Sequence, residues 1–230
     1  MTLPSKAHAY VWQKIDDGLF YTETENIHAF QIDPKLFKLS VATAKDQNET
    51  DSTVRMMAKK SSAILTVNGG FFSPEHRSLG LLMRDGKVIN PVHATSWWGI
   101  FEISKNKPEI VTVRMFQPNP DIEMALQSGP RLVINGEIPK LKYSVDRRSG
   151  IGIRADGNVI IAVTGDKELS MEAFAELFQK PESKGGLDCK NALNLDGGGS
   201  TQLYFSWKGL KVDVLGSSRI ANAVAIFPRR

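Results

Sequence analysis

The chain has 230 residues, of which 41% are hydrophobic and 23% charged, a composition typical of a folded globular protein. Its net charge of +4 comes from scattered lysines and arginines, so the dense basic patch that nucleic-acid binding needs is not indicated. No apolar run approaches the ~18 residues of a membrane span. The single cysteine, Cys189, excludes an intrachain disulfide and is expected to be a small buried residue.

The first 60 residues, including VWQKIDDGLFYTET, are expected to form strands that complete a sheet. The opening stretch MTLPSKAHAY lacks the apolar core of a signal peptide. The cellular location stays open: periplasmic or extracellular if a signal peptide was removed, and cytoplasmic otherwise.

Two segments have helical periodicity. In DSTVRMMAKKS (51–61), Asp51 or Ser52 can cap a helix with a short apolar stripe. In SMEAFAELFQK (170–180), Ser170 can cap a second helix, whose apolar residues also share one face. Both stripes are typical of packing against a core.

Glycine-containing turns dominate the rest of the chain. Tight turns between extended runs are predicted at Asp85-Gly86, Asn135-Gly136, Asp156-Gly157 and Lys208-Gly209. We therefore expect an α+β fold with a mostly antiparallel or mixed sheet, rich in hairpins and carrying a few packed helices. No linker divides the chain, which favours a single domain over residues 1–230.

Two of the predicted strands run directly into glycines, in AILTVNGGFF and ALNLDGGGS. We expect them to deliver two polar loops to one edge of a sheet. Gly197–Gly199 expose backbone N–H groups that can bind a phosphate or sugar oxygen, although a purely structural turn has the same sequence. Near Asn68 and Gly69, Phe71 or Phe72 can stack on a sugar, or both rings can belong to the core.

Asp166 and Asp196 follow predicted strands and form the obvious pair of carboxylates for acid and base roles, although a solvated loop aspartate is the alternative for each. Arg148 can hold an anion or lie on the surface. Either Trp97 or Trp98 can line a sugar site, or both can pack in the core or an interface.

Metal sites have little support in the sequence. The four histidines lack ligand spacing, so we predict no zinc site and no required cofactor, while a structural calcium ion on loop carboxylates stays possible. The glycine loops do not match the phosphate-binding pattern that ends in Gly-Lys-Ser/Thr, the dinucleotide pattern or the serine nucleophile elbow.

Five segments in order give a more specific signal: LTVNGGFF, SGPRLVINGE, RRSGIGIRADGNVIIAVTGD, NALNLDGGGSTQLYF and IANAVAIF. Together they resemble the phosphodiester glycosidase family over residues 61–228, the motif-bearing core. The resemblance implies an α+β domain that cleaves between a sugar's anomeric carbon and a bridging phosphate. The chain departs from the family pattern at Ser149-Gly150 and at Gly165–Lys167.

The resemblance also implies the residues of the site. Catalytic roles fall on Asp196 and Asp166. The implied substrate-binding residues are Asn68, Gly69, Arg148, Gly197, Gly198, Gly199, Ser200 and Asn222.

The sequence therefore predicts a hydrolase that acts on a glycosyl phosphodiester or a related glycosidic bond in a cell-envelope or polysaccharide substrate. Its expected partner is a carbohydrate or sugar phosphate, and its oligomeric state stays open. Two alternatives remain: a non-catalytic module that binds phosphorylated glycans, and a structural envelope protein in which the glycines serve only turns.

Overall fold

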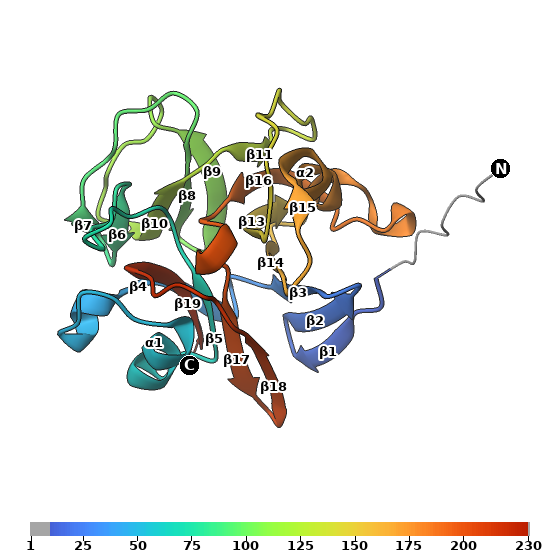
Figure 1. The fold of residues 1–230 in the computed structure, drawn as a ribbon, viewed down its shortest axis with the longest axis horizontal. Coiled ribbons are helices and arrows are strands. Elements are labelled where there is room, and N and C mark those ends of the chain that lie inside the picture. Colours follow the sequence, from blue (N-terminus) through green and yellow to red (C-terminus); the bar gives the residue numbers. More distant parts are fainter. Residues whose placement is uncertain (1–9, 230) are drawn as a thin grey trace.

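The computed structural model describes residues 10–229. The stretch assessed above for a signal peptide therefore lies, except for its last residue, outside the described residues. Within the described part, every strand pairing is antiparallel, and the strands form three large sheets and one two-stranded ribbon (Figure 1). These sheets and two helices confirm the α+β class.

Sheet A has seven strands, and its middle is built from segments far apart in the sequence. The strands in spatial order are β1 (Gln13–Asp16), β2 (Leu19–Thr24), β3 (Ile27–Ile32), β14 (Val159–Thr164), β13 (Ser149–Arg154), β16 (Cys189–Asn194) and β11 (Arg131–Val133).

Sheets B and C have five strands each. Sheet B follows the order β18 (Leu210–Val214), β17 (Leu203–Trp207), β5 (Leu65–Asn68), β19 (Asn222–Pro228) and β4 (Phe37–Thr43). Sheet C follows the order β7 (Lys87–Asn90), β6 (Leu82–Arg84), β10 (Ile122–Ser128), β8 (Gly99–Ser104) and β9 (Lys107–Thr112). The ribbon joins β12 (Val145–Asp146) to β15 (Leu169–Ser170).

One hydrophobic core joins all three large sheets. Phe30 of sheet A, Phe205 of sheet B and Phe101 of sheet C are fully buried members of it. The aromatic rings of Phe30 and Phe205 lie 4.8 Å apart between centroids, which ties sheet A to sheet B. Because each strand alternates its side chains between two faces, the opposite faces are left for other elements to cover.

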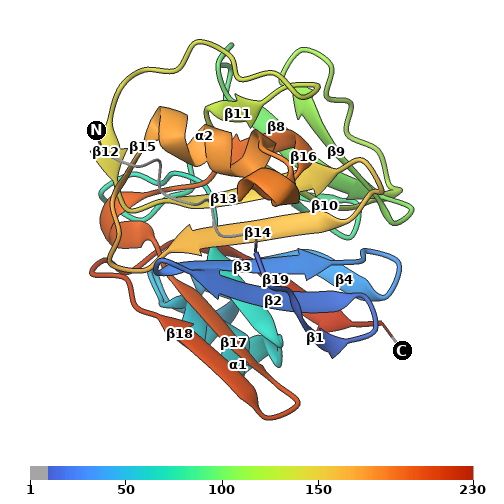
Figure 2. The ribbon, with the colours of Figure 1, turned by 90° about the vertical axis from the view of Figure 1, so that its right-hand side faces the viewer.

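The two helices cover these outer faces. α2 (Met171–Gln179) packs on sheet A and α1 (Val54–Ser61) packs on sheet B; in both views α2 lies in the upper half of the molecule and α1 in the lower half (Figures 1 and 2). Phe174 and Phe178 of α2 pack so closely on sheet A that a β carbon at Gly150 would lie 2.9 Å from each ring. Glycine at this position therefore allows the helix to approach the strand.

Most of the predicted turns and helices are present. The turns Asp85-Gly86 and Lys208-Gly209 join paired strands, and both residues of each have positive φ. Asn135-Gly136 has the same geometry, but the residues on either side of it, Ile134 and Glu137, form only an isolated β-bridge.

The first helix starts later than the sequence suggested. Its N-cap is Thr53, whose hydroxyl accepts a hydrogen bond from the Met56 N–H at 3.3 Å, so the expected caps Asp51 and Ser52 were wrong. Ser52 is still extended because it forms a β-bridge with Ile220. The second cap, Ser170, is confirmed by its bond from the Ala173 N–H at 3.0 Å.

Candidate functional site

The two glycine loops meet, although they leave different sheets. Asn68 ends β5 in sheet B, and Asp196 follows β16 in sheet A. The Asn68 amide donates to the backbone oxygen of Asp196 at 2.7 Å, and the Asp196 N–H donates to the Gly69 oxygen at 3.0 Å. The expectation of one shared sheet edge was therefore wrong, because the loops converge across the junction of two sheets.

The side chains of Asn68 and Asn222 stabilise this junction through buried hydrogen bonds. The buried Asn68 side chain accepts hydrogen bonds from the Ser149 hydroxyl at 2.7 Å and the Gln202 N–H at 3.1 Å. The buried Asn222 side chain accepts from the Gly70 N–H at 2.8 Å. Neither asparagine lines the cavity described below, so the structure gives both a positioning role.

The loop at Gly197–Gly199 owes its path to small residues. Gly198 has φ +59°, and a β carbon there would lie 3.0 Å from the Asp146 carboxylate. A β carbon at Gly197 would lie 2.9 Å from the Arg147 oxygen. The glycines thus let the chain around Asp146 approach the loop.

The backbone N–H groups of this loop are mostly engaged inside the protein. The Gly197 N–H donates to the Asp196 carboxylate at 3.0 Å, and the Gly198 N–H donates to the Arg147 oxygen at 2.9 Å. The Ser200 N–H donates to the Gly197 oxygen at 3.1 Å. Within the described chain, Gly199 is the member of this loop whose N–H has no acceptor, so a phosphate cradle built from all three glycines does not match the geometry.

A cavity of about 530 Å³ opens beside the loop. Asp196, Gly197, Asp146 and Arg148 line it, together with a wall of apolar side chains and two lysines. The remaining lining residues are Phe71, Trp97, Gly129, Pro130, Lys140, Leu141, Lys142, Ser144, Met171 and Asn194.

Two aromatic side chains give the cavity its open apolar wall. Trp97 is 57% exposed and lies edge-on to the buried Trp98, with 5.5 Å between ring centroids. Phe71 packs on the same Trp98 at 5.0 Å. Phe72 instead stacks on His76 and does not line the cavity. Phe71 and Trp97 are therefore the aromatic residues positioned to contact a ligand.

Arg148 lies at the floor and is held rigidly. Its guanidinium donates to the Ser144 oxygen at 2.6 Å, to the Ser144 hydroxyl at 2.9 Å and to the Leu169 oxygen at 3.1 Å. Its remaining nitrogen, Nη1, faces Gly197 and has no acceptor among residues 10–229. Burial lowers the pKa of Arg148, and the negative charge of Asp146 opposes that effect. Arg148 is thus a fixed cation with one donor group directed toward the loop.

Two carboxylates, Asp196 and Asp146, share the cavity. Burial raises the pKa of Asp196, and repulsion from Asp146 adds to the rise, while the Ser200 hydroxyl and the Gly197 N–H oppose it. The Asp146 carboxylate accepts a hydrogen bond from the Arg147 N–H at 2.9 Å. Two carboxyl groups in different environments are a common basis for separate acid and base roles.

Asp166, the second carboxylate expected from the sequence, is not part of this arrangement. It is exposed and does not line the cavity. Asp146 is the second carboxylate that lines the cavity, and the catalytic role of Asp166 stays a prediction. The available signal for Asp146 was its position two residues before Arg148, inside the polar segment that precedes the motif RRSGIGI.

No group of three or more metal-ligating side chains occurs within the described part of the chain. The same part contains no helix long and apolar enough to span a membrane. The candidate site consists of carboxylates, cations and aromatic rings.

Comparisons with known proteins support a glycosidase-like fold for this chain. A family model described as phosphodiester glycosidase matches residues 61–227, and the chain belongs to that family. The sequence resemblance is thereby confirmed.

The chain is also similar to individual proteins and solved structures. The chain is 25% identical over 198 residues to the uncharacterized protein YigE of Escherichia coli, covering 79% of this chain and 76% of the relative. The fold of this chain is similar to that of the zebrafish N-acetylglucosamine-1-phosphodiester alpha-N-acetylglucosaminidase catalytic domain auto-inhibited by its pro-peptide. That match has a TM-score of 0.69 and 18% identity, and covers 96% of this chain and 82% of the other. A hypothetical protein from Synechocystis matches with a TM-score of 0.58 and 16% identity, over 96% of this chain and 61% of the other.

Proposed function

We propose that the protein is a hydrolase that cleaves a glycosyl phosphodiester or a related glycosidic bond in a cell-envelope or polysaccharide substrate. The observation that carries this proposal is the shared cavity of Asp196, Asp146 and Arg148. The family assignment supports the same reaction class.

The charges of the cavity fit an anionic substrate. Arg148, Lys140 and Lys142 outnumber the carboxyl groups of Asp146 and Asp196. Burial raises the pKa of Asp196, which disfavours a second negative charge in the cavity. A phosphodiester carries one negative charge, which Arg148 can neutralise through its free donor group.

We assign the roles from this arrangement. Cleavage breaks the bond between the anomeric carbon and the bridging oxygen, and the electron pair stays on that oxygen. Asp196, carrying a proton, assists the departure of the phosphate, and the Asp146 carboxylate stabilises positive charge at the anomeric carbon. Water adds to that carbon, and its proton passes to a carboxylate. Phe71 and Trp97 offer ring faces to the sugar.

We further propose that this chemistry needs no metal or other cofactor, since carboxylates alone perform glycosyl transfer to water in many hydrolases. A structural calcium ion would affect stability and leave the reaction chemistry unchanged. Activity that EDTA abolishes and only a transition metal restores would contradict this part of the proposal.

A substrate screen tests the function directly. Aryl glycosides and sugar-1-phosphodiesters are assayed for turnover, with binding to the same compounds measured in parallel by calorimetry. We expect turnover of at least one sugar-1-phosphodiester. Binding without turnover would favour a glycan-binding module, and neither binding nor turnover would favour a structural role.

A further inference from the structure

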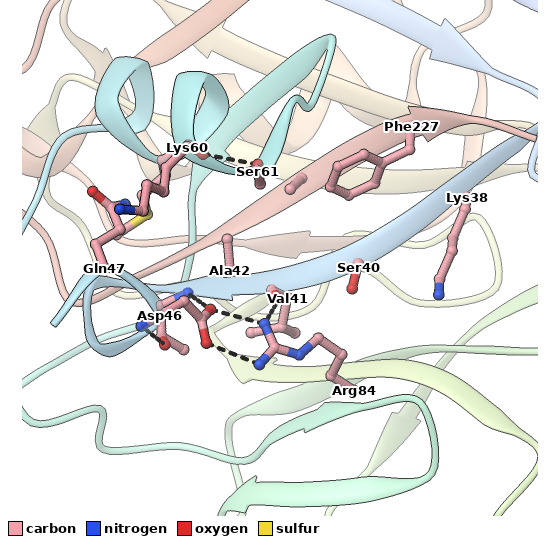
Figure 3. A pocket seen from close by; sticks show the side chains of 13 residues that line it. Lys38, Ser40, Val41, Ala42, Asp46, Gln47, Lys60, Ser61, Arg84 and Phe227 are labelled. Atoms are coloured by element: carbon pink, nitrogen blue, oxygen red, sulfur yellow. Dashed lines mark hydrogen bonds and ion pairs between the residues drawn. The ribbon is translucent and has the colours of Figure 1, made fainter.

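A second cavity lies on the outer face of sheet B, and it shares no lining residue with the candidate site. Its volume is about 470 Å³, within the range of small-molecule sites. It lies between β4, β19, the C-terminal end of α1, the short 3-10 helix η1 (Ala44–Gln47) and the end of β6 (Figure 3).

Small side chains create this hollow. Ser40 and Ala42 on β4 and Ala225 on β19 line it, and Ser40 pairs directly with Ala225 in the sheet register. Elsewhere on this face, α1 packs against the strands and fills the space. The partly exposed Phe227 and the buried Met57, which is 1% exposed, also line the cavity. The cavity thus has an apolar floor that helix α1 does not reach.

A buried hydroxyl opens into this cavity. Ser40 is only 6% exposed. Its side chain lines the cavity, and its Oγ is not one of the fully enclosed polar atoms that lack a hydrogen-bond partner in the described part of the chain. A hydroxyl that remains accessible from the cavity can hydrogen-bond to a ligand there in place of water.

The rim of the cavity is predominantly cationic. Arg84 is matched by Asp46 through two hydrogen bonds of 2.8 and 2.9 Å, and Lys38 lies 2.7 Å from Asp85. Lys60 has no ion-pair partner in the described part of the chain. One full positive charge therefore remains at the rim beside the C-terminal turn of α1.

We propose that this cavity binds a small organic anion that carries an apolar ring or chain. The apolar part packs on Phe227 and Met57. The acidic group lies toward Lys60 and accepts a hydrogen bond from the Ser40 hydroxyl. A purely inorganic anion would leave the apolar walls without contact, and a neutral apolar molecule would leave Ser40 and Lys60 without a polar partner.

Phenyl phosphate serves as the probe because it combines both properties. The 15N-labelled protein is titrated with it while backbone amide signals are followed. We expect concentration-dependent shifts at Ser40, Ala225 and Phe227. Inorganic phosphate and phenol, titrated separately, should each bind at least about fivefold more weakly. The absence of shifts at these amides, or equal affinity for either fragment, would overturn the proposal. Shifts at Asp196 report the candidate active site and do not count as support.

A matched pair of charge reversals locates the anion. Lys60→Glu should weaken phenyl phosphate binding about tenfold, the scale of a lost charge-assisted hydrogen bond. Lys59→Glu makes the same charge change on the neighbouring exposed lysine, which does not line this cavity, and should have less than a twofold effect. Equal effects of the two variants would contradict a local site.

Ser40→Leu tests the hollow itself, since the larger side chain occupies it. We expect binding at the cavity to be lost while the thermal midpoint stays close to that of the parent protein. Retained affinity would overturn the proposal. If this variant fails to fold, the two lysine variants still decide the question.

Discussion

Asp196→Asn separates the chemistry of the candidate site from its architecture. The backbone of residue 196 bonds to Asn68 and Gly69, and these bonds do not involve the carboxyl group. An asparagine oxygen can still accept the Gly197 N–H that now lies 3.0 Å from Asp196 Oδ1. The loop should therefore keep its conformation.

Turnover should fall strongly. Loss of acid or base assistance costs about 10²-fold or more, which corresponds to about 2.7 kcal/mol of barrier. Steady-state kinetics on a sugar-1-phosphodiester identified by the screen measures this loss. Full turnover by Asp196→Asn would remove Asp196 from the mechanism.

The same substitution should raise the stability of the folded protein although it lowers turnover. Because burial raises the pKa of Asp196 in the folded state, ionisation of this carboxyl costs folding free energy. The contribution of protonated Asp196 to the stability of the parent protein is complete below the unfolded-state pKa of about 4. It is lost as the pH rises through the folded-state pKa. Asparagine removes that cost, so the thermal midpoint of the variant relative to the parent should rise with pH across this window. A variant that unfolds at neutral pH would show that the carboxylate is structural.

Five other substitutions extend the argument. Asp146→Asn should lower turnover by about 10²-fold, whereas Asp166→Asn, which changes an exposed carboxylate outside the cavity, should stay within about twofold; the reverse order would restore the pair expected from sequence. Gly198→Val should cost about 1–3 kcal/mol through its positive φ and should also reduce turnover, because its β carbon lies 3.0 Å from Asp146. Gly157→Val has similar backbone strain with no atom within 4 Å, so denaturant unfolding should show a loss while kinetics should not. Gly150→Ala should destabilise by about 1–3 kcal/mol through contact with the rings of α2 and leave kcat unchanged, and a drop in kcat at full folding would contradict that account.

Local features of the fold could be predicted because their causes are local. Asp85-Gly86 and Lys208-Gly209 form tight turns with positive φ at both positions, a conformation that glycine adopts freely and aspartate tolerates. Ser170 caps its helix through a bond that spans three residues. Such signals need no knowledge of the rest of the chain.

The division of strands among three sheets could not be predicted in the same way. β5 and β16 have similar apolar sequences followed by glycines, yet one pairs with β17 and β19 and the other with β13 and β11. Partner choice depends on long-range register, which single strands do not encode. The sequence therefore predicted that the two loops meet, but it placed them at the edge of one sheet and not at the junction of two sheets.

The presence of Asp146 in the cavity could not be predicted for a related reason. Asp166 follows a clear strand, so its position at a strand end was visible in the sequence. Asp146 belongs to a two-residue strand in a polar segment with no hydrophobic periodicity. Its approach to Gly198 depends on the pairing of β12 with β15, which becomes evident only in three dimensions.

The position of β19 has a consequence for the order of folding. This strand, residues 222–228, lies between β5 and β4, so it supplies the hydrogen-bonding partner for both. Its first residue, Asn222, also fixes the Gly69-Gly70 segment. On a ribosome, β4 and β5 are made long before β19 leaves the exit tunnel, and their edges stay unpaired until then. The junction between the two glycine loops is consequently among the last parts of the protein to assemble. Nascent chains that stall before residue 222 expose two unpaired strand edges that can aggregate.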